Sequence, residues 1–367
     1  MSVPPEPGPG RPRRPRRRRV LLALGVTGVV LALVAGYTAR TYGDRPLEVT
    51  DAQRAAMSEE AARHLDGMRP IFLPDFLVST VVTEERLARE AAAFEEQERP
   101  VQDELIERYS LTVEDRTVGG VPVLVVTPPE IAPGQEGRIA LNVHGGGFFL
   151  GSARERVGLM LAHELGMPVY SVNYTLSPEA VYPQAVNEVL AVYRELVAEH
   201  DPADVIAFGS SSGGNLLASA VLAAAEEGLP MAAALALFTP ITDLTGIGDS
   251  VEANDRRDGL VANLRIDVPG RVYAGDEPLD SPGVSPVYAD FPADFPPTVL
   301  TAGTRDMNLS DNVRLSWRLE EAGVENRLLV SEGMWHGHHW EVDLPEAVRT
   351  RAAAAGFLRE HLDAADG

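Results

Sequence analysis

The pentapeptide GSSSG at positions 209–213 constrains the fold of this chain more than any other feature. It lies between a short apolar run, 205–208, and an apolar helical pattern that begins near Asn215. The form G-x-S-x-G is typical of a sharp turn that joins a buried strand to a helix and exposes one serine hydroxyl above a parallel sheet. Larger side chains two positions before or after that serine would clash. Only Ser211 has glycine at both positions, and an ordinary Gly/Ser loop is the alternative interpretation.

Two polar residues follow Ser211 at the ends of later apolar runs. Asp306 comes just after the run 298–302, and His336 comes just after the run 327–330. A serine hydroxyl becomes a good nucleophile when a base takes its proton, and the imidazole that does so is oriented by a carboxylate. In sheet-based serine hydrolases these groups follow in the order serine, acid, histidine, each after a strand. We therefore predict that Ser211, Asp306 and His336 form a catalytic triad.

Alternatives remain for the acid and for the base. His338 or His339 could replace His336, or the three histidines could bind a metal ion. Carboxylates or histidines at ligand spacing are not evident elsewhere, so we expect no metal site and no cofactor. Asp311 could replace Asp306, although it is also well placed to cap the helix that follows.

A glycine run follows another apolar segment, where His144 precedes the glycines 145–147. Cleavage of an ester places negative charge on the former carbonyl oxygen, and backbone N–H groups must already point to that position. Glycines let the chain approach the oxygen closely, and the amide of Ser212 lies next to the candidate nucleophile. The run lacks the lysine and the spacing of a phosphate-binding loop, and an ordinary turn is the alternative.

Strand-like and helix-like patterns alternate after residue 111. A β-hairpin is expected over 111–128, around a Gly-Gly turn. Further strands are expected at 138–143, 168–174, 205–208, 233–238, 298–301 and 327–330, and helices at 155–165, 183–199, 216–226, 311–322 and 345–362. The alternation predicts an α/β fold with a mostly parallel central sheet covered by helices on both faces. Before it, helical stretches at 51–65 and 83–109 are expected to be broken by prolines at 70, 74 and 100.

Composition limits the class of protein. The 367 residues, 45% of them apolar, suffice for one large α/β domain with an accessory segment, and the absence of cysteine excludes disulfides and a thiol nucleophile. Residues 1–19 contain seven arginines and one glutamate, a net charge of +6, so the net charge of −22 leaves −28 for the remainder. Such an acidic body should repel nucleic acid and favours neutral or cationic substrates, although solubility alone could explain it.

The first forty residues predict a membrane attachment. Residues 1–19 are expected to be a disordered basic tail, and 20–39 form an uncharged, mostly apolar run long enough to cross a bilayer as a helix. The arginines before this run place the tail in the cytoplasm and the remaining chain outside. We therefore expect a signal anchor in the cytoplasmic membrane that contacts lipid through 20–39, or else a secreted protein after signal cleavage.

Taken together, the motifs resemble those of the hormone-sensitive-lipase-like branch of the α/β-hydrolase fold, a group of bacterial esterases and acetylhydrolases. The resemblance runs from about 121 to 362 and includes the blocks HGGGF at 144–148, YTLSPE at 174–179, YP at 182–183, GSSSGG at 209–214, TDL at 242–244 and the segment 306–311. Ser210 and Ser212 depart from the residues common in that branch, but both are small. The resemblance implies that the amides of Gly146, Gly147 and Ser212 form the oxyanion hole. It also implies a catalytic domain at 111–367 and a helical cap from 45–110 and 245–275.

The sequence thus predicts a serine-dependent carboxylic-ester hydrolase that acts through an acyl-enzyme on a small to medium neutral ester. Phe148, Phe149 and Trp340 are candidates for the substrate pocket, although each could equally belong to the core. A lactonase, an amidase or a lipase of the same fold, and a binding protein that keeps the pocket without turnover, are the alternatives. The sequence does not indicate the oligomeric state.

Overall fold

The computed structural model describes residues 47, 49–68, 83–259 and 269–364. Within them an eight-stranded sheet has the order β1-β2-β4-β3-β5-β6-β7-β8. β1 and β2 form an antiparallel hairpin at one edge, β2 is antiparallel to β4, and all remaining pairs are parallel. The mostly parallel sheet and the edge hairpin are as predicted. The strands are β1 Thr112–Val118, β2 Val121–Thr127, β3 Ile139–Val143, β4 Val169–Val172, β5 Val205–Ser210, β6 Ala234–Phe238, β7 Thr298–Gly303 and β8 Asn326–Ser331.

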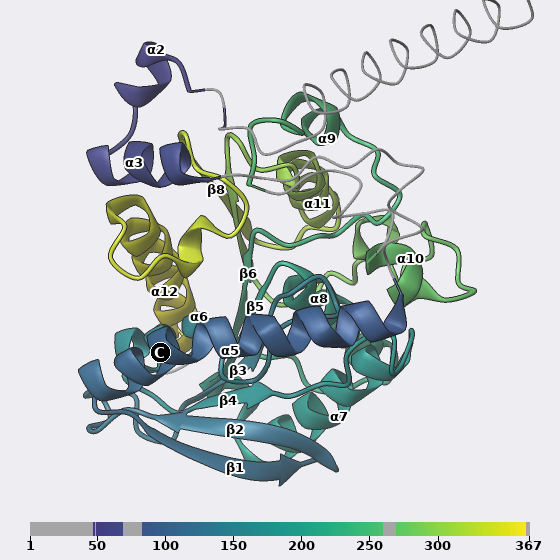
Figure 1. The fold of residues 1–367 in the computed structure, drawn as a ribbon. Coiled ribbons are helices and arrows are strands. Elements are labelled where there is room, and N and C mark those ends of the chain that lie inside the picture. The colour runs from purple at the N-terminus through teal and green to yellow at the C-terminus, as the bar shows by residue number, and fades with distance from the viewer. Residues whose placement is uncertain (1–46, 48, 69–82, 260–268, 365–367) are drawn as a thin grey trace, which may run out of the picture. The chain divides into compact units, whose positions relative to one another are not determined.

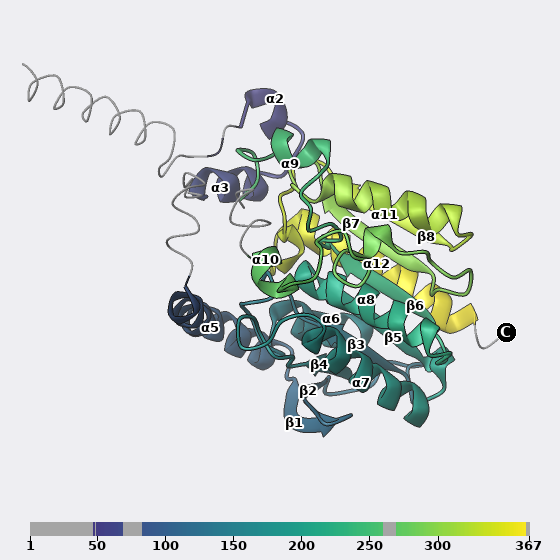
Figure 2. The same cartoon turned by 90° about the vertical axis from the view of Figure 1, so that its right-hand side faces the viewer.

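Helices cover both faces of the sheet because the central strands are apolar on both sides. Along β5, Val205 and Ala207 belong to one core, whereas Ile206 and Phe208 belong to the other. The first core is shared with α7 (Gln184–Glu199), α8 (Ser212–Glu226), α10 (Pro269–Ala274) and α11 (Leu309–Glu321), and the second with α6 (Arg156–Leu165) and α12 (Pro345–Ala364). Figure 2 shows α8 and α11 on one side of the sheet and α12 on the other.

The predicted stretch 51–65 consists of two short helices, α2 (Asp51–Arg54) and α3 (Glu59–Gly67). Ser58 starts α3, because its side chain accepts a hydrogen bond from the backbone N–H of Ala61. The apolar face of α3 packs against Trp335 and its neighbours, and His64 stacks on the Trp335 ring with centroids 4.6 Å apart. This N-terminal helix therefore rests on the segment that carries His336.

One long helix, α5 (Glu84–Arg108), follows, and Pro100 lies inside it. The prediction that Pro100 breaks the helix is wrong. Proline removes one backbone donor and crowds the preceding turn, but Pro100 and Glu96 are both exposed, so water can satisfy the carbonyl that loses its partner. Figure 1 shows α5 as a single unbroken rod. The prolines at 70 and 74 lie outside the described residues.

The segment 245–275 contains α9 (Asp249–Ala253) and α10, and residues 260–268 between them are not described. α9 contacts α11, which follows β7. Three single-turn 3₁₀ helices complete the described secondary structure: η1 Pro202–Asp204, η3 Pro286–Tyr288 and η4 His338–Trp340.

The predicted transmembrane helix needs correction. In the described part of the chain, no helix is both long enough and apolar enough to cross a membrane. α5 and α12 have 25 and 20 residues but carry many charges, whereas the apolar α8 has only 15, about 22 Å at 1.5 Å per residue. Residues 1–19 and 20–39 lie outside the described part. We withdraw the signal anchor, the lipid contact through 20–39, the single-pass topology and the extracytoplasmic or secreted location.

Candidate active site

Ser211 lies at the turn between β5 and α8, with φ 53° and ψ −118°. This backbone conformation is costly for a residue with a side chain, and it persists only where the surroundings enforce it. A Cβ atom on Gly209 would lie 2.6 Å from the carbonyl oxygen of Gly213, and one on Gly213 would lie 2.1 Å from that of Val143. Both glycines are therefore required sterically, as the sequence pattern predicts.

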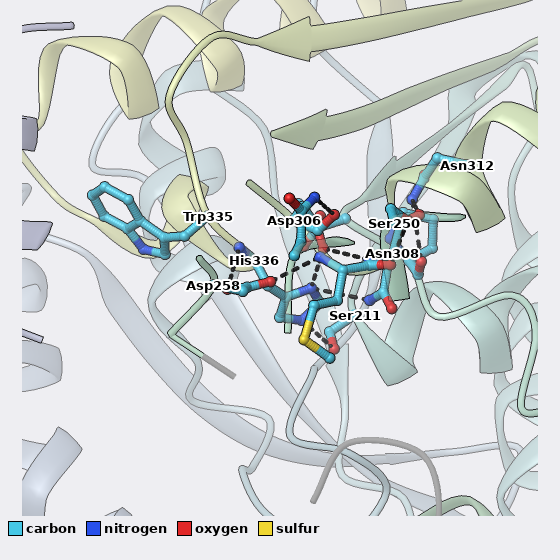
Figure 3. Close-up of polar contacts among 12 residues, drawn as sticks. Ser211, Ser250, Asp258, Asp306, Asn308, Asn312, Trp335 and His336 are labelled. Carbon is cyan, nitrogen blue, oxygen red and sulfur yellow. Dashed lines mark hydrogen bonds and ion pairs between the residues drawn. The ribbon is translucent and has the colours of Figure 1, made fainter. Parts of the chain in front are cut away.

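The structure brings the three predicted triad residues together. His336 Nε2 lies 2.9 Å from Ser211 Oγ, and His336 Nδ1 lies 3.2 Å from Asp306 Oδ1. All three side chains are at least 93% buried. Figure 3 shows the three side chains close together. They follow β5, β7 and β8, whose carboxyl ends lie along one edge of the parallel sheet. In this arrangement the imidazole can take the hydroxyl proton while the carboxylate stabilises the resulting positive charge.

Asn308 is a neighbour of the triad that the sequence analysis missed. Its backbone N–H donates to Asp306 Oδ1 at 2.8 Å, and its side-chain amide contacts His336 Nδ1 at 3.0 Å. With Nδ1 protonated and bound to Asp306, the amide oxygen is the chemically favoured atom to face it. Asn308 thus orders both the acid and the base. Its position two residues after a candidate acid was the only signal in the sequence.

Asp258 is the second residue that the sequence analysis missed. It is fully buried, and its two carboxylate oxygens accept hydrogen bonds from the backbone N–H groups of His336 and Met307. Burial, reinforced by the charge of Asp306, raises the pKa of Asp258 to about 6. Nothing in its local sequence marks it, because it acts on residues about fifty and eighty positions further along the chain.

The predicted oxyanion groups belong to the glycine run and to the residue after Ser211. The first glycine of the run, Gly145, lies beside Ser211, since a Cβ atom on it would be 3.4 Å from Ser211 Cβ. Gly146 has φ 121°, and a Cβ atom there would lie 2.1 Å from the carbonyl oxygen of Leu150, so the glycine is required. Ser212 is the first residue of α8, where backbone N–H groups have no partner within the helix. The N–H groups of Gly146, Gly147 and Ser212 donate to no acceptor among the described residues. They remain available for a ligand oxygen.

The alternative bases pack differently. His338 bonds the carbonyl of Trp335 and the hydroxyl of Thr350, and burial lowers its pKa to about 4. His339 contacts Ser210 Oγ at 3.2 Å, and burial lowers its pKa well below the usual value. Among the described residues neither makes a hydrogen bond to Ser211, and both should remain neutral at pH 7.

Asp311, the alternative acid, lies in the first turn of α11 and not at its cap. The helix begins at Leu309, two residues earlier than predicted, and Asn308 occupies the capping position. The histidine contact is made by Asp306 instead.

Comparison with known proteins agrees with this geometry. Residues 140–340 match a protein family whose description is the alpha/beta hydrolase fold. The chain belongs to the α/β-hydrolase family. This α/β-hydrolase is similar to LipR of Mycobacterium tuberculosis, provisionally named an acetyl-hydrolase, with 34% identity over 257 residues that cover 68% of this chain and 81% of the relative.

Two solved structures of esterases extend the similarity. Esterase E25 is 30% identical, has a TM-score of 0.77 and is matched over 86% of this chain and 97% of its own. An esterase from the bacterial hormone-sensitive lipase family is 29% identical, with a TM-score of 0.67 over 79% of this chain and 100% of its own. The α/β-hydrolase described here is thus a carboxylic-ester hydrolase of the hormone-sensitive-lipase-like branch, as its motifs predict.

A cavity of about 140 Å³ lies next to the glycine run of this α/β-hydrolase. Gly145, Gly146 and Trp340 form one side, and side chains of α5 form the other. Glu155 also lines it and accepts hydrogen bonds from the N–H of Gly145 at 3.4 Å and from Trp340 Nε1 at 3.3 Å. Burial of its carboxyl group raises the pKa of Glu155 to about 8, although part of the side chain still faces the cavity.

The three candidate pocket residues thus lie in different surroundings. Trp340 lines the cavity and lies edge-on to the His336 ring, with centroids 6.2 Å apart. Phe148 is buried and stacks on Tyr273 at 3.9 Å between centroids, which is a core position. Phe149 is half-buried and is not among the residues that line this cavity.

Proposed function

We propose that this carboxylic-ester hydrolase works through an acyl-enzyme on Ser211, with His336 as the base and Asp306 as the residue that orients it. The observation that carries the proposal is the continuous line of contacts from Ser211 Oγ to His336 Nε2 at 2.9 Å and from His336 Nδ1 to Asp306 at 3.2 Å. A serine in a strained turn, an imidazole and a carboxylate in this order are the parts that activate a hydroxyl.

The chemistry proceeds in two halves. Ser211 Oγ attacks the ester carbonyl carbon while His336 takes its proton, and the carbonyl oxygen becomes an oxyanion that the N–H groups of Gly146, Gly147 and Ser212 stabilise. The carbon–oxygen bond to the alcohol then breaks, and His336 returns the proton to the leaving oxygen. In the second half, water replaces the alcohol, releases the acid and restores Ser211.

The substrate that we propose is a small to medium neutral ester. A cavity of about 150 Å³ can hold a molecule the size of benzene. The cavity beside Gly146, which Glu95, Glu98 and Glu155 also line, is of similar volume and has room for a short acyl or alkoxy group. The name of LipR, an acetyl-hydrolase, supports hydrolysis of acetyl esters. We further propose that 111–367 is the catalytic domain and that 45–110 and 245–275 form a cap. The contribution of Phe94, Glu95, Glu98 and Gln102 from α5 to the cavity supports the first cap segment.

The decisive test is Ser211→Ala in the full chain. Turnover of p-nitrophenyl acetate should fall roughly 10⁴-fold or more, because removal of the nucleophile leaves only binding and oxyanion stabilisation. A fluorophosphonate probe should label the parent protein and Ser210→Ala, but not Ser211→Ala. His336→Ala should slow the labelling strongly. Turnover retained by Ser211→Ala would refute the acyl-enzyme.

A further inference from the structure

One segment outside the triad contacts the backbone of the loops that carry Asp306 and His336. Residues 249–258 present Ser250, Asn254 and Asp258 at intervals of four, and these three polar side chains are 94% buried or more. Polar side chains are rarely buried without partners, because their lost hydration must be replaced. Figure 3 shows Ser250 and Asp258 on opposite sides of Asp306.

Ser250 and Asn254 bind the loop that follows β7. Ser250 Oγ donates to the carbonyl of Met307 at 2.7 Å and accepts from the N–H of Ser310 at 2.8 Å. Asn254 Nδ2 donates to the carbonyl of Asp306 at 3.0 Å. The backbone at Asp306 and directly after it is therefore held by side chains from one segment.

Asp258 differs from these two because it joins two loops. Its Oδ2 accepts from the N–H of Met307 at 2.8 Å, and its Oδ1 accepts from the N–H of His336 at 3.1 Å. Met307 follows Asp306 directly. One carboxylate thus bridges the residue next to the acid and the base itself, which lie in the loops that follow two separate strands, β7 and β8.

We propose that Asp258 is a positioning residue for ester hydrolysis, which sets the placement of the His336 imidazole relative to Asp306 by bridging the backbone of their two loops. The inference rests on the proposed roles of Ser211, His336 and Asp306. Its physical basis is that a misplacement of about 1 Å among reacting groups can cost on the order of 100-fold in rate.

The charge of Asp258 adds an electrostatic effect. The titratable and charged groups around it are Asp306 and Arg305 from the loop after β7, His336 from the loop after β8, and Arg257 beside it in the chain. Ionised Asp258 attracts a positive charge on the His336 ring, as the carboxylate of Asp306 does. Neutralising Asp258 therefore disfavours the imidazolium that forms during the reaction.

The test compares Asp258→Asn with Glu252→Gln, an exposed carboxylate of the same segment, in the full chain. The rates of p-nitrophenyl acetate hydrolysis are measured from about pH 5 to about pH 9 and divided by the fraction of sites that a fluorophosphonate titrates. Asp258→Asn should lower kcat about 10- to 100-fold with little change in KM, and the acidic limb of kcat/KM should move to lower pH. Glu252→Gln should match the parent.

The outcomes separate the two proposals. If Asp258→Asn keeps kcat within about twofold and leaves the acidic limb in place, Asp258 does not position the base. Asp258→Asn could instead lose sites that the fluorophosphonate titrates while kcat per remaining site and the acidic limb of kcat/KM stay unchanged. Asp258 would then have a structural role only, and the proposal would also be overturned. If Asp258→Asn does not fold, Asp258→Ser supplies the same readout with a smaller uncharged acceptor. Activity in Ser211→Ala would instead refute the proposed function, whatever Asp258→Asn does.

Discussion

Ser211 illustrates how a local steric rule can identify a single side chain. Three serines are adjacent, and the two glycines that the turn requires select only the middle one. The rule could be applied to the sequence alone because it requires small residues at fixed positions. The atom that a side chain at Gly213 would meet is nevertheless the carbonyl oxygen of Val143 on β3. Asn308 and Asp258 could not be found in this way, since each acts on His336 from another part of the chain. Their roles depend on how three loops meet in space.

Glu155 provides a prediction about the dependence of stability on pH. Its folded-state pKa of about 8 lies above the ordinary value of 4.5, so the folded chain keeps a proton that the unfolded chain loses between these values. Stability should therefore decrease as pH rises through this window and then level off above about pH 8. Glu155→Gln removes this dependence while its amide oxygen can still accept from Gly145 and Trp340.

The melting temperatures of Glu155→Gln and the parent, measured at about pH 5, 7 and 9, test this. The variant should gain stability relative to the parent as pH rises. Glu107→Gln, an exposed carboxylate on α5, should show no such trend. A constant difference between Glu155→Gln and the parent at all three values would contradict the assignment.

In helix α5, tertiary contacts outweigh the low helix propensity of Pro100. Arg156 on α6 binds both carboxylate oxygens of Glu98 at 2.6 Å, and Arg108 near the end of α5 does the same with Asp343 at 2.8 and 2.9 Å. These tertiary contacts hold the helix on both sides of Pro100. Intrinsic propensity is a weak guide to such a segment, because packing contributes more than the local preference of one residue.

Pro100→Ala should therefore stabilise the protein. Alanine restores one hydrogen bond and removes the ring clash, a gain that the greater freedom of the unfolded chain partly offsets, for a net increase of about 1–2 kcal/mol in the free energy of unfolding. Urea denaturation followed by circular dichroism measures it. Pro133→Ala, at an exposed turn, serves as the control and should lose a few tenths of a kcal/mol. A destabilised Pro100→Ala would show that the proline has a role of its own.

The loops after β5, β7 and β8 converge because parallel strands all end at the same edge of the sheet. This is why the order of Ser211, Asp306 and His336 along the chain was informative before any contact was known. The predicted strand bounds needed only small changes. By contrast, α8 begins at Ser212, four residues before the predicted helix at 216, since the helix starts immediately at the turn.

For the whole chain, the net charge of −22 leads to a prediction about substrates. An acidic surface should slow the approach of anionic esters relative to neutral ones, and salt should reduce the difference. The ratio of kcat/KM for p-nitrophenyl acetate to that for mono-p-nitrophenyl succinate should therefore fall severalfold between about 20 mM and about 500 mM NaCl. If the ratio does not change with salt, the preference for the neutral ester comes from the substrate pocket alone.

The sequence by itself determined the sheet, the turn at Ser211 and the order of the three polar residues, because these follow from periodicity and from residue types at fixed spacing. Only the tertiary structure decided that Asp258 bridges the loops of Asp306 and His336, that Trp340 and Glu155 line the cavity beside Gly146, and that α3 rests on Trp335. Such contacts join side chains far apart in the chain, and their energies depend on burial and distance, which exist only after folding.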